Sequence, residues 1–233
     1  MNFFSNKLKP KNYKKIIKNY SKDLSKEFVL KNWGLFSGDK SFYRTLKLFQ
    51  LISQIQKIKG DVVEFGIWNG NNLLTIKKIL DFLKSNKKLF GYDHFEGLKN
   101  PNKKDKYFFK KDIGTYAGDK KLINYTIKFL RLKNIKIIDE DIMNLEKKLK
   151  NFKKLSFIYI DCDLYEPTLK ILKLLTPKLS KGGIIAFDEG NDNKKWTGEA
   201  KALNEFLLLN KKKFKRTYLK KSYQPEVILT KLV

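Results

Sequence analysis

The stretch Ser156-Phe-Ile-Tyr-Ile-Asp-Cys-Asp-Leu-Tyr-Glu-Pro-Thr168 decides the fold class of this chain. It begins as an unbroken apolar run, which is typical of a parallel strand that is buried on both faces. The run ends in Asp161 and Asp163, and Pro167 follows where the first turn of a helix is expected. A buried strand that leads through acids into a helix indicates an open α/β sheet.

The same pattern recurs in Gly183-Ile-Ile-Ala-Phe-Asp-Glu-Gly190, a second apolar strand that ends in Asp188 and Glu189. Ligands of open α/β sheets bind beyond the carboxyl ends of the strands. Four carboxylates at two such ends indicate a bed for a hard cation. Acids at strand ends also cap helices, but a cap accounts for one carboxylate such as Asp163 and not for all four.

An earlier strand leads into a glycine turn. Asp61-Val-Val-Glu-Phe-Gly-Ile-Trp-Asn-Gly70 predicts a strand, a turn at Gly66 and Gly70, and then a helix whose N-terminus offers free N–H groups to a ligand. The third glycine of the dinucleotide fingerprint is absent, which disfavours a nicotinamide-dependent dehydrogenase. With the acidic strand residue Glu64, the turn resembles the arrangement with which class I methyltransferases hold S-adenosylmethionine.

Two further strand ends supply acids for such a cofactor. Asp93 ends an apolar strand about 25 residues beyond the glycine turn, near the position from which an acid accepts hydrogen bonds from ribose hydroxyls. Asp141 follows the strand that begins at Ile135, and we expect it to accept a hydrogen bond from the adenine amino group. Asp139 and Glu140 are alternatives for that role.

The periodicity of the remaining chain predicts helices between these strands. Helices are expected over 41–58, 73–84, 122–132, 168–179 and 199–209, and two closing strands over 214–219 and 227–232. Residues 100–119 are predicted to be a loop or a lid. Alternation of strands and helices predicts a single α/β domain with a mostly parallel sheet and a terminal antiparallel strand pair.

The chain carries 51 basic and 24 acidic residues, a formal net charge of +27. Such a field attracts nucleic acid, anionic membrane or phosphorylated metabolites. Only three of the basic residues are arginines and the lysines are spread along the chain, whereas phosphate- and base-reading surfaces favour the arginine fork. A lysine-biased composition therefore explains the charge better than a nucleic-acid surface, and a nucleic-acid methyltransferase or a basic nucleic-acid-binding protein is the alternative interpretation.

No stretch reaches the run of about 18 uncharged apolar residues that a membrane span needs, and the lysine-rich start lacks the apolar core of a signal peptide. The single cysteine, Cys162, excludes an internal disulfide framework and is expected to be a small buried residue. We therefore expect a soluble, cytoplasmic protein. The sequence allows a homo-oligomer.

Four motifs resemble the macrocin O-methyltransferase family. They are Val63–Gly70, Asp93–Leu98, Ile160–Thr168 and Phe187–Glu189, within a region of similarity that runs from residue 42 to 206. The resemblance implies a Rossmann-like class I methyltransferase fold with a seven-stranded sheet. It implies S-adenosylmethionine as cofactor, Mg²⁺, and a sugar hydroxyl as the methyl acceptor. Residues 1–40 would then form a lysine-rich N-terminal arm, and residues 41–233 the methyltransferase domain.

The resemblance also implies roles for the acids. Asp161, Asp188 and Glu189 would hold the metal ion, and Asp163 would be the catalytic base. The family commonly has an Asp-Asp pair where this chain has Asp188-Glu189, and a serine where it has His94. His94, the one histidine, is an alternative base, although a structural neighbour of the ribose acid is the simpler interpretation.

These residues predict a metal-assisted transfer. A Mg²⁺ ion could chelate two adjacent hydroxyls of the sugar and lower the pKa of one. Asp163 could then take the proton, because an ordinary aspartate is too weak a base for a free alcohol. The expected acceptor is a nucleotide sugar, a glycan or a glycosylated metabolite, and the positive charge of the chain favours an acceptor that carries phosphates.

Overall fold

The computed structural model describes residues 26–37, 39–99, 101–105, 110–191, 196–219 and 224–233. Its centre is one seven-stranded sheet in the order β3-β2-β1-β4-β5-β7-β6. The strands are β1 (Asp61–Phe65), β2 (Leu89–Asp93), β3 (Ile135–Asp139), β4 (Leu155–Ile160), β5 (Leu179–Phe187), β6 (Phe214–Tyr218) and β7 (Val227–Lys231). The first five are parallel, and β7 runs antiparallel between β5 and β6. The predicted α/β sheet with a terminal antiparallel pair is confirmed.

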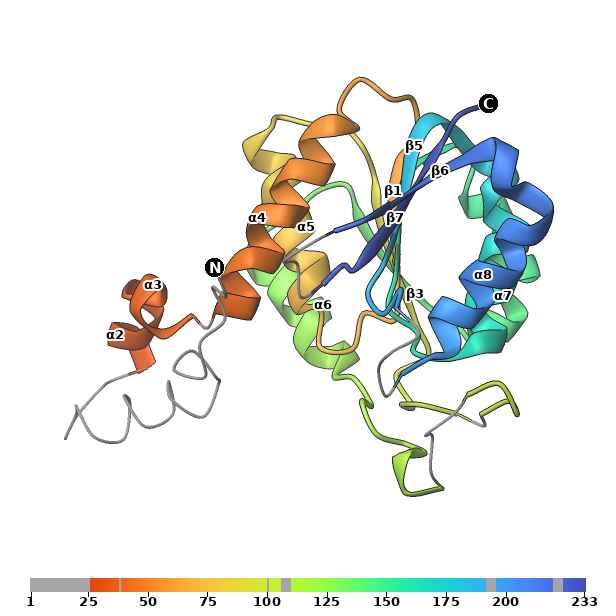
Figure 1. Cartoon of the computed structure of the whole chain (residues 1–233). Coiled ribbons are helices and arrows are strands. Elements are labelled where there is room, and N and C mark those ends of the chain that lie inside the picture. Colours follow the sequence, from red (N-terminus) through yellow and green to blue (C-terminus); the bar gives the residue numbers. More distant parts are fainter. Residues whose placement is uncertain (1–25, 38, 100, 106–109, 192–195, 220–223) are drawn as a thin grey trace, which may run out of the picture.

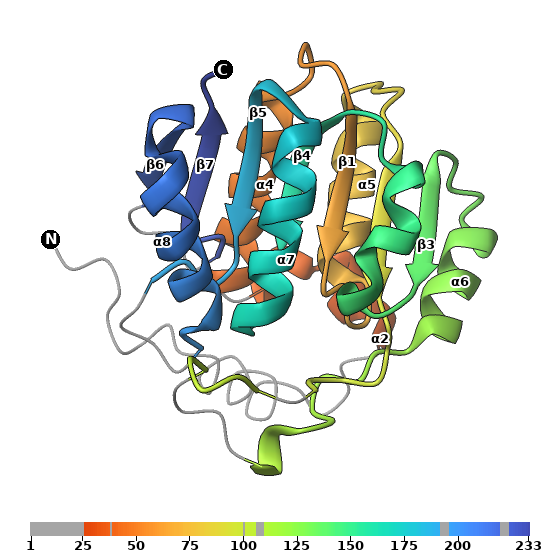
Figure 2. The ribbon, with the colours of Figure 1, turned by 90° about the vertical axis from the view of Figure 1, so that its right-hand side faces the viewer.

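Helices cover both faces of the sheet (Figures 1 and 2). One face is covered by α4 (Asp39–Gln54), α5 (Asn71–Phe82) and α6 (Lys120–Phe129), and the other by the 3-10 segment η3 (Ile142–Asn151), α7 (Tyr165–Leu175) and α8 (Gly198–Asn210). Each face buries its own apolar cluster. The strand β4 is buried along its whole length, as its unbroken apolar run predicts.

Helix ends differ from the expectations by a few residues. The helix expected over 168–179 is α7, which ends at Leu175 because β5 already begins at Leu179, with a short 3-10 turn (Thr176–Lys178) between them. Pro167 lies in the first turn of α7, where backbone N–H groups have no partner within the helix, so the N–H that proline lacks is not missed. The sequence-based prediction did not include η3, whose second half belongs to a lysine-rich run.

The N-terminal arm expected over residues 1–40 is described only from residue 26. There α2 (Lys26–Lys31) and α3 (Trp33–Phe36) stand to one side of the sheet and its helices (Figure 1). Of the loop expected over 100–119, residues 100 and 106–109 lie outside the described part. No helix in the described ranges is both long and apolar enough to cross a membrane.

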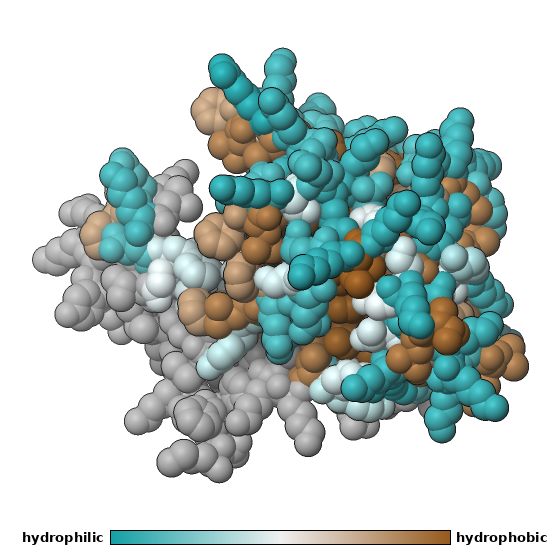
Figure 3. All heavy atoms as spheres, turned by 90° about the horizontal axis from the view of Figure 1, so that it is seen from above, coloured by the Kyte–Doolittle hydropathy of each residue, from teal (hydrophilic) through white to brown (hydrophobic). Residues whose placement is uncertain are grey.

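The end of the sheet at which the parallel strands begin is mostly hydrophilic (Figure 3). Lysines surround a shallow hollow at this end: Lys57, Lys59, Lys153, Lys154, Lys178 and Lys181. The carboxyl ends of the strands, where the predicted site residues lie, are at the opposite end of the sheet.

Candidate active site

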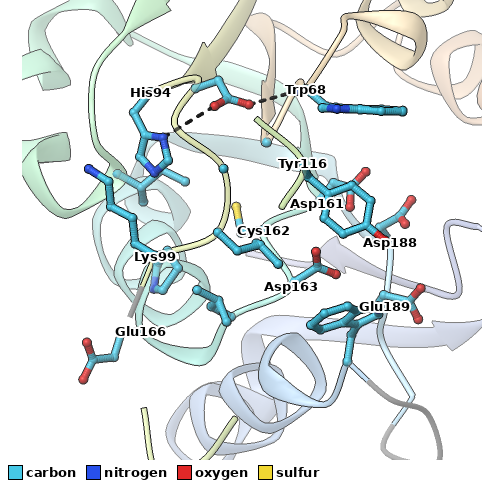
Figure 4. Close-up of a pocket in the computed structure, with 18 of the residues that line it drawn as sticks. Trp68, His94, Lys99, Tyr116, Asp161, Cys162, Asp163, Glu166, Asp188 and Glu189 are labelled. Carbon is cyan, nitrogen blue, oxygen red and sulfur yellow. Dashed lines mark hydrogen bonds and ion pairs between the residues drawn. The ribbon is translucent and has the colours of Figure 1, made fainter. Parts of the chain in front are cut away.

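A cavity of about 550 Å³ opens at the carboxyl ends of the parallel strands. Most of the predicted site residues line it: Gly66, Asp93, Asp141, Asp161, Asp163, Asp188 and Glu189. Figure 4 shows His94 and Lys99 on one side of this cavity and Asp188 and Glu189 on the other. We call the first the His94 side (Asp93, His94, Lys99, Asp141 and Met143) and the second the acidic bed (Asp161, Asp163, Asp188 and Glu189).

The carboxylates of the His94 side are held by backbone N–H groups. Asp93 ends β2, and its two oxygens accept from the N–H groups of Trp68 at 2.9 Å and Phe95 at 2.7 Å. Asp141 accepts from the Met143 N–H at 2.8 Å and from the Lys99 ammonium at 2.9 Å. Burial by itself would raise the pKa of Asp141, but these two donors lower it. Both carboxylates are thus fixed in place by hydrogen bonds.

Of the three acids after β3, only Asp141 lines the cavity. Asp139 pairs with Lys120, and Glu140 accepts from Asn144 and pairs with Lys148. The side chain of His94 also lines the cavity, where its Nδ1 accepts from the Glu96 N–H.

The glycine turn brings β1 against β4. Gly66 has a φ of +78°, and a Cβ atom there would lie 1.8 Å from the carbonyl oxygen of Asp161, so only glycine fits. Gly70 (φ +77°) begins α5 and packs on Ile123, and it does not line the cavity. Nor does Glu64, which is buried and accepts from the Asn72 amide at 3.0 Å. The structure therefore leaves the predicted cofactor contacts of Glu64 and Gly70 untested.

The acidic bed is more deeply buried. Asp188 is 2% exposed, and it accepts from the Tyr159 hydroxyl and from the Arg44 guanidinium at 3.0 Å. Burial and the neighbouring Asp188 and Asp163 raise the pKa of Asp161 well above its usual range. Burial also raises the pKa of Asp188, although Arg44 and Tyr159 oppose the rise. Asp161 and Asp188 also hydrogen-bond each other, which likewise opposes the rise in the pKa of Asp188.

Glu189 is turned toward another partner. Its Oε1 accepts from the Gln224 amide at 2.9 Å, and the carbonyl oxygen of that amide accepts from Arg44. Within the described ranges no three acidic, imidazole or thiol side chains converge closely enough to hold a metal ion. The predicted ligands Asp161, Asp188 and Glu189 thus share one cavity, but their carboxylates do not meet at one point.

A buried glutamate that the site prediction omitted ties the bed together. Glu199, at the start of α8, is fully buried and accepts from the N–H groups of Cys162 at 2.7 Å, Asp163 at 3.0 Å and Glu189 at 3.1 Å. One carboxylate therefore joins the ends of β4 and β5. It also holds Asp163 in a left-handed backbone conformation (φ 59°), which is uncommon for a residue with a side chain.

Gly198 lets α8 approach this closely. A Cβ atom on Gly198 would meet the carbonyl oxygen of Asp163, the N–H of Tyr165 and the carboxylate of Asp105 at 2.3–2.5 Å. The Asp105 carboxylate in turn accepts from the Tyr165 N–H at 2.8 Å, at the start of α7. The described part of the 100–119 loop is therefore attached to the site.

Three aromatic rings stand at the cavity from three different segments. Trp68 comes from the glycine turn, Tyr116 from the 100–119 loop and Trp196 from the segment before α8, and all three line the cavity. The ring centroids of Trp68 and Tyr116 are 6.0 Å apart, and those of Tyr116 and Trp196 are 6.4 Å apart, each pair edge to face. Trp68 and Tyr116 are about half exposed, so their rings are accessible to a ligand.

Sequence reasoning missed several functional-site residues: Arg44, Tyr159, Glu199, Gln224 and the aromatic rings. Arg44 had a signal, because it is one of only three arginines in a lysine-rich chain. Glu199 lies within the Trp-x-Gly-Glu-x-x-Ala stretch that begins at Trp196. Tyr159 and Gln224 carried no signal in the sequence, because their roles depend on partners that are distant along the chain.

The charge of the cavity is opposite to that of the protein. Seven acidic side chains line it, against the two basic side chains of Arg44 and Lys99, and both of these are ion-paired with lining acids. The protein as a whole has a net charge of +27. Such a cavity favours a cationic ligand.

Three features together define the class I methyltransferase fold. They are a glycine turn after β1, an acid at the end of β2, and a β7 that runs antiparallel to the parallel strands of the sheet. Solved structures agree. The calicheamicin methyltransferase CalS11 superposes with a TM-score of 0.77 at 24% identity, covering 95% of this chain and 90% of that one. The O-methyltransferase NovP superposes with a TM-score of 0.71 at 18% identity, covering 85% and 82%.

Within that class, the sequence profile of the macrocin-O-methyltransferase (TylF) family matches residues 40–215, and the chain belongs to this family. A curated relative, demethyldecarbamoylnovobiocin O-methyltransferase of Streptomyces niveus, is 26% identical over 151 residues. These residues are 57% of this chain and 53% of the relative, so the chain spans about half the length of the curated protein that it matches. The family expected from the four motifs is confirmed.

Proposed function

We propose that the protein is an S-adenosylmethionine-dependent O-methyltransferase that acts on a sugar hydroxyl with the help of Mg²⁺. The observation that carries the proposal is the shared cavity. The strand-end acid Asp93 and the acidic bed line one space of about 550 Å³. A methyl donor on the His94 side and an acceptor over the bed would therefore be neighbours, and orientation of the two supplies much of a transfer rate.

The His94 side suits the nucleoside part of the cofactor. Each carboxylate oxygen of Asp93 accepts one backbone hydrogen bond and keeps a second lone pair, which a ribose hydroxyl could use. Asp141 lines the same side of the cavity and would accept from the adenine amino group, and Met143 and Leu98 add apolar lining. One solved neighbour, the SAH-bound Podospora anserina methyltransferase PaMTH1, has a TM-score of 0.55 at 15% identity, which supports the fold alone.

The donor set fits a hard cation by its chemistry. Asp161, Asp188 and Glu189 offer carboxylate oxygens, the ligands that Mg²⁺ prefers, in a cavity with an excess of acidic side chains. When bound, such an ion would lower the pKa of a coordinated hydroxyl. Asp163, on the same loop as Asp161, would take the proton from that hydroxyl. Glu199 would keep the Asp163 backbone in place.

The aromatic rings support a sugar as acceptor. A pyranose ring has an apolar C–H face, and Trp68, Tyr116 and Trp196 offer aromatic surface beside the acidic bed. The neighbour CalS11 is described as a TDP-rhamnose 3'-O-methyltransferase. A nucleotide sugar is therefore the first acceptor class to test.

The experiment is a methyl-transfer screen over nucleotide sugars with radiolabelled S-adenosylmethionine, with Mg²⁺ and with EDTA. We expect transfer to at least one sugar, lost in EDTA and restored by Mg²⁺. Transfer that persists in EDTA would remove the metal from the proposal, and transfer to RNA but to no sugar would replace it by a nucleic-acid methyltransferase. The +27 charge favours that alternative, but the lysines that line the hollow where the parallel strands begin lie at the end of the sheet away from the cavity.

A further inference from the structure

One guanidinium reaches two of the acids that the proposed function assigns to the metal. The Nη2 atom of Arg44 lies 3.0 and 3.3 Å from the two carboxylate oxygens of Asp188 and also donates to the side-chain oxygen of Gln224. The amide nitrogen of Gln224 donates to Glu189 at 2.9 Å. Arg44 therefore holds Asp188 directly and Glu189 through one amide.

The pair is largely removed from water, with side-chain exposures of 22% for Arg44 and 3% for Asp188. A buried carboxylate is costly without an opposite charge beside it. In the described part of the cavity wall the other basic side chain, Lys99, is paired with Glu96 and Asp141 on the His94 side. Among the described residues of the cavity wall, Arg44 is thus the basic side chain that is paired with the acidic bed.

A divalent ion would use the same oxygens. Both Asp188 oxygens already accept from Arg44, and one of them also accepts from the Tyr159 hydroxyl. An ion bound there would also stand within a few ångströms of a like charge in a poorly hydrated site, which is strongly unfavourable. The ion and the guanidinium therefore cannot occupy Asp188 together.

We propose that Arg44 is the resident counter-cation of the acidic bed and that a divalent metal ion displaces it from Asp188. Without metal, Arg44 stabilises the buried carboxylates and keeps Glu189 turned toward Gln224. With metal, Asp188 and Glu189 are released to the ion. Arg44 thereby weakens metal binding and makes the fold independent of the metal. The inference rests on the metal role within the proposed function.

The test measures Mn²⁺ binding to the full chain by electron paramagnetic resonance, without cofactor or acceptor. It compares wild type, Arg44→Gln and the matched control Arg131→Gln, which removes the same charge from an exposed position outside the cavity. We expect Arg44→Gln to bind Mn²⁺ about 5- to 100-fold more tightly than wild type, the usual range for coupling between two ligands. Arg131→Gln should bind as wild type does.

Thermal unfolding supplies a second readout. In EDTA, Arg44→Gln should unfold at a lower temperature than wild type, and saturating Mn²⁺ should raise its melting temperature by more than it raises that of wild type. If Arg44→Gln does not fold in EDTA, Arg44→Lys is used, which keeps the charge on a shorter and more strongly hydrated side chain. It should bind Mn²⁺ more tightly than wild type by a smaller factor.

Equal or weaker Mn²⁺ binding by a folded Arg44 variant would overturn the inference, and so would absence of Mn²⁺ binding from both proteins. The first result leaves the proposed function untouched, whereas the second would remove the metal from it and keep the methyltransferase, which is judged by calorimetric S-adenosylmethionine binding and by methyl transfer to a sugar. A variant that binds Mn²⁺ as wild type does, in a protein that methylates a sugar only with Mg²⁺, would reject Arg44 as counter-cation and keep the methyltransferase.

Discussion

On the His94 side of the cavity, Asp93 and Asp141 accept hydrogen bonds from backbone N–H groups that belong to their own and neighbouring turns. In the acidic bed, Asp161 and Asp188 are buried against each other, and Asp188 accepts hydrogen bonds from the Arg44 guanidinium and the Tyr159 hydroxyl. Burial works against the ionised form of Asp141, but its two donors lower its pKa, whereas burial and the acidic neighbours raise the pKa of Asp161. The His94 side is thus preformed to receive hydrogen-bond donors, whereas the acidic bed has an excess of acidic groups that a cation would balance.

The largest effect should come from Asp161→Ala. Loss of this carboxylate removes a proposed ligand of the metal ion that would acidify the acceptor hydroxyl, and methyl transfer should fall on the order of 10³-fold. The affinity for S-adenosylmethionine should change by less than about threefold, because Asp93 and Asp141 are untouched. Calorimetry and single-turnover transfer measure the two quantities. A variant that loses cofactor affinity as well would show that the two sides are not separate.

Next is Glu199→Ala. It leaves three buried N–H groups without their acceptor, so the free energy of unfolding should fall by about 3 kcal/mol or more. Glu205→Ala is the control, because it lies on the same helix α8 but is half-exposed, and loss of its contacts with Lys104 and the Tyr165 hydroxyl should lower the free energy of unfolding much less in urea denaturation. Equal midpoints for the two variants would contradict the role of Glu199 as the group that joins β4 to β5.

Glu64 lies behind the cavity wall, and burial raises its pKa from the ordinary 4.5 to about 8. Between these values the folded protein keeps a proton that the unfolded chain has released, so this group lowers stability as the pH rises from about 5 to 8. Glu64→Gln has no such dependence. Relative to wild type it should gain on the order of 3 kcal/mol between pH 5 and pH 8, as measured by urea denaturation. Parallel stability curves for the two proteins would show that Glu64 is already ionised.

The smallest effect is expected on the His94 side. Asp93→Asn replaces one acceptor oxygen by an amide nitrogen, and the affinity for S-adenosylmethionine should fall about tenfold to a hundredfold. Asp139→Asn is the matched control, because Asp139 is the register partner of Asp93 on β3 but does not line the cavity. Its affinity should equal that of wild type in calorimetry. If Asp93→Asn binds normally, the ribose site has been misplaced.

Local patterns were sufficient for the elements that carry the site. The apolar runs before Asp93, Asp161 and Asp188 are strands β2, β4 and β5, because a buried parallel strand needs apolar residues on both faces. The strand ends then meet at one edge by topology, which explains why seven of the predicted site residues line one cavity. The end of α7 and the segment η3 were less predictable, because both depend on packing against neighbouring elements.

The partnerships of the acids had no such local signal. Arg44 and Asp188 are 144 residues apart, and Glu199 meets Cys162 from 37 residues away. Whether a carboxylate is an anion, a proton carrier or a bridge between loops depends on its burial and on its nearest charges, and both are properties of the folded chain.

The sequence alone thus determined the family, the order of strands and helices, and the acids that gather at the carboxyl edge, because these follow from residue type and spacing. The tertiary structure decided which acids face the cavity and which cation neutralises them. It placed Arg44 against Asp188 and Glu199 between β4 and β5, since desolvation and ion pairing act through space and not along the chain.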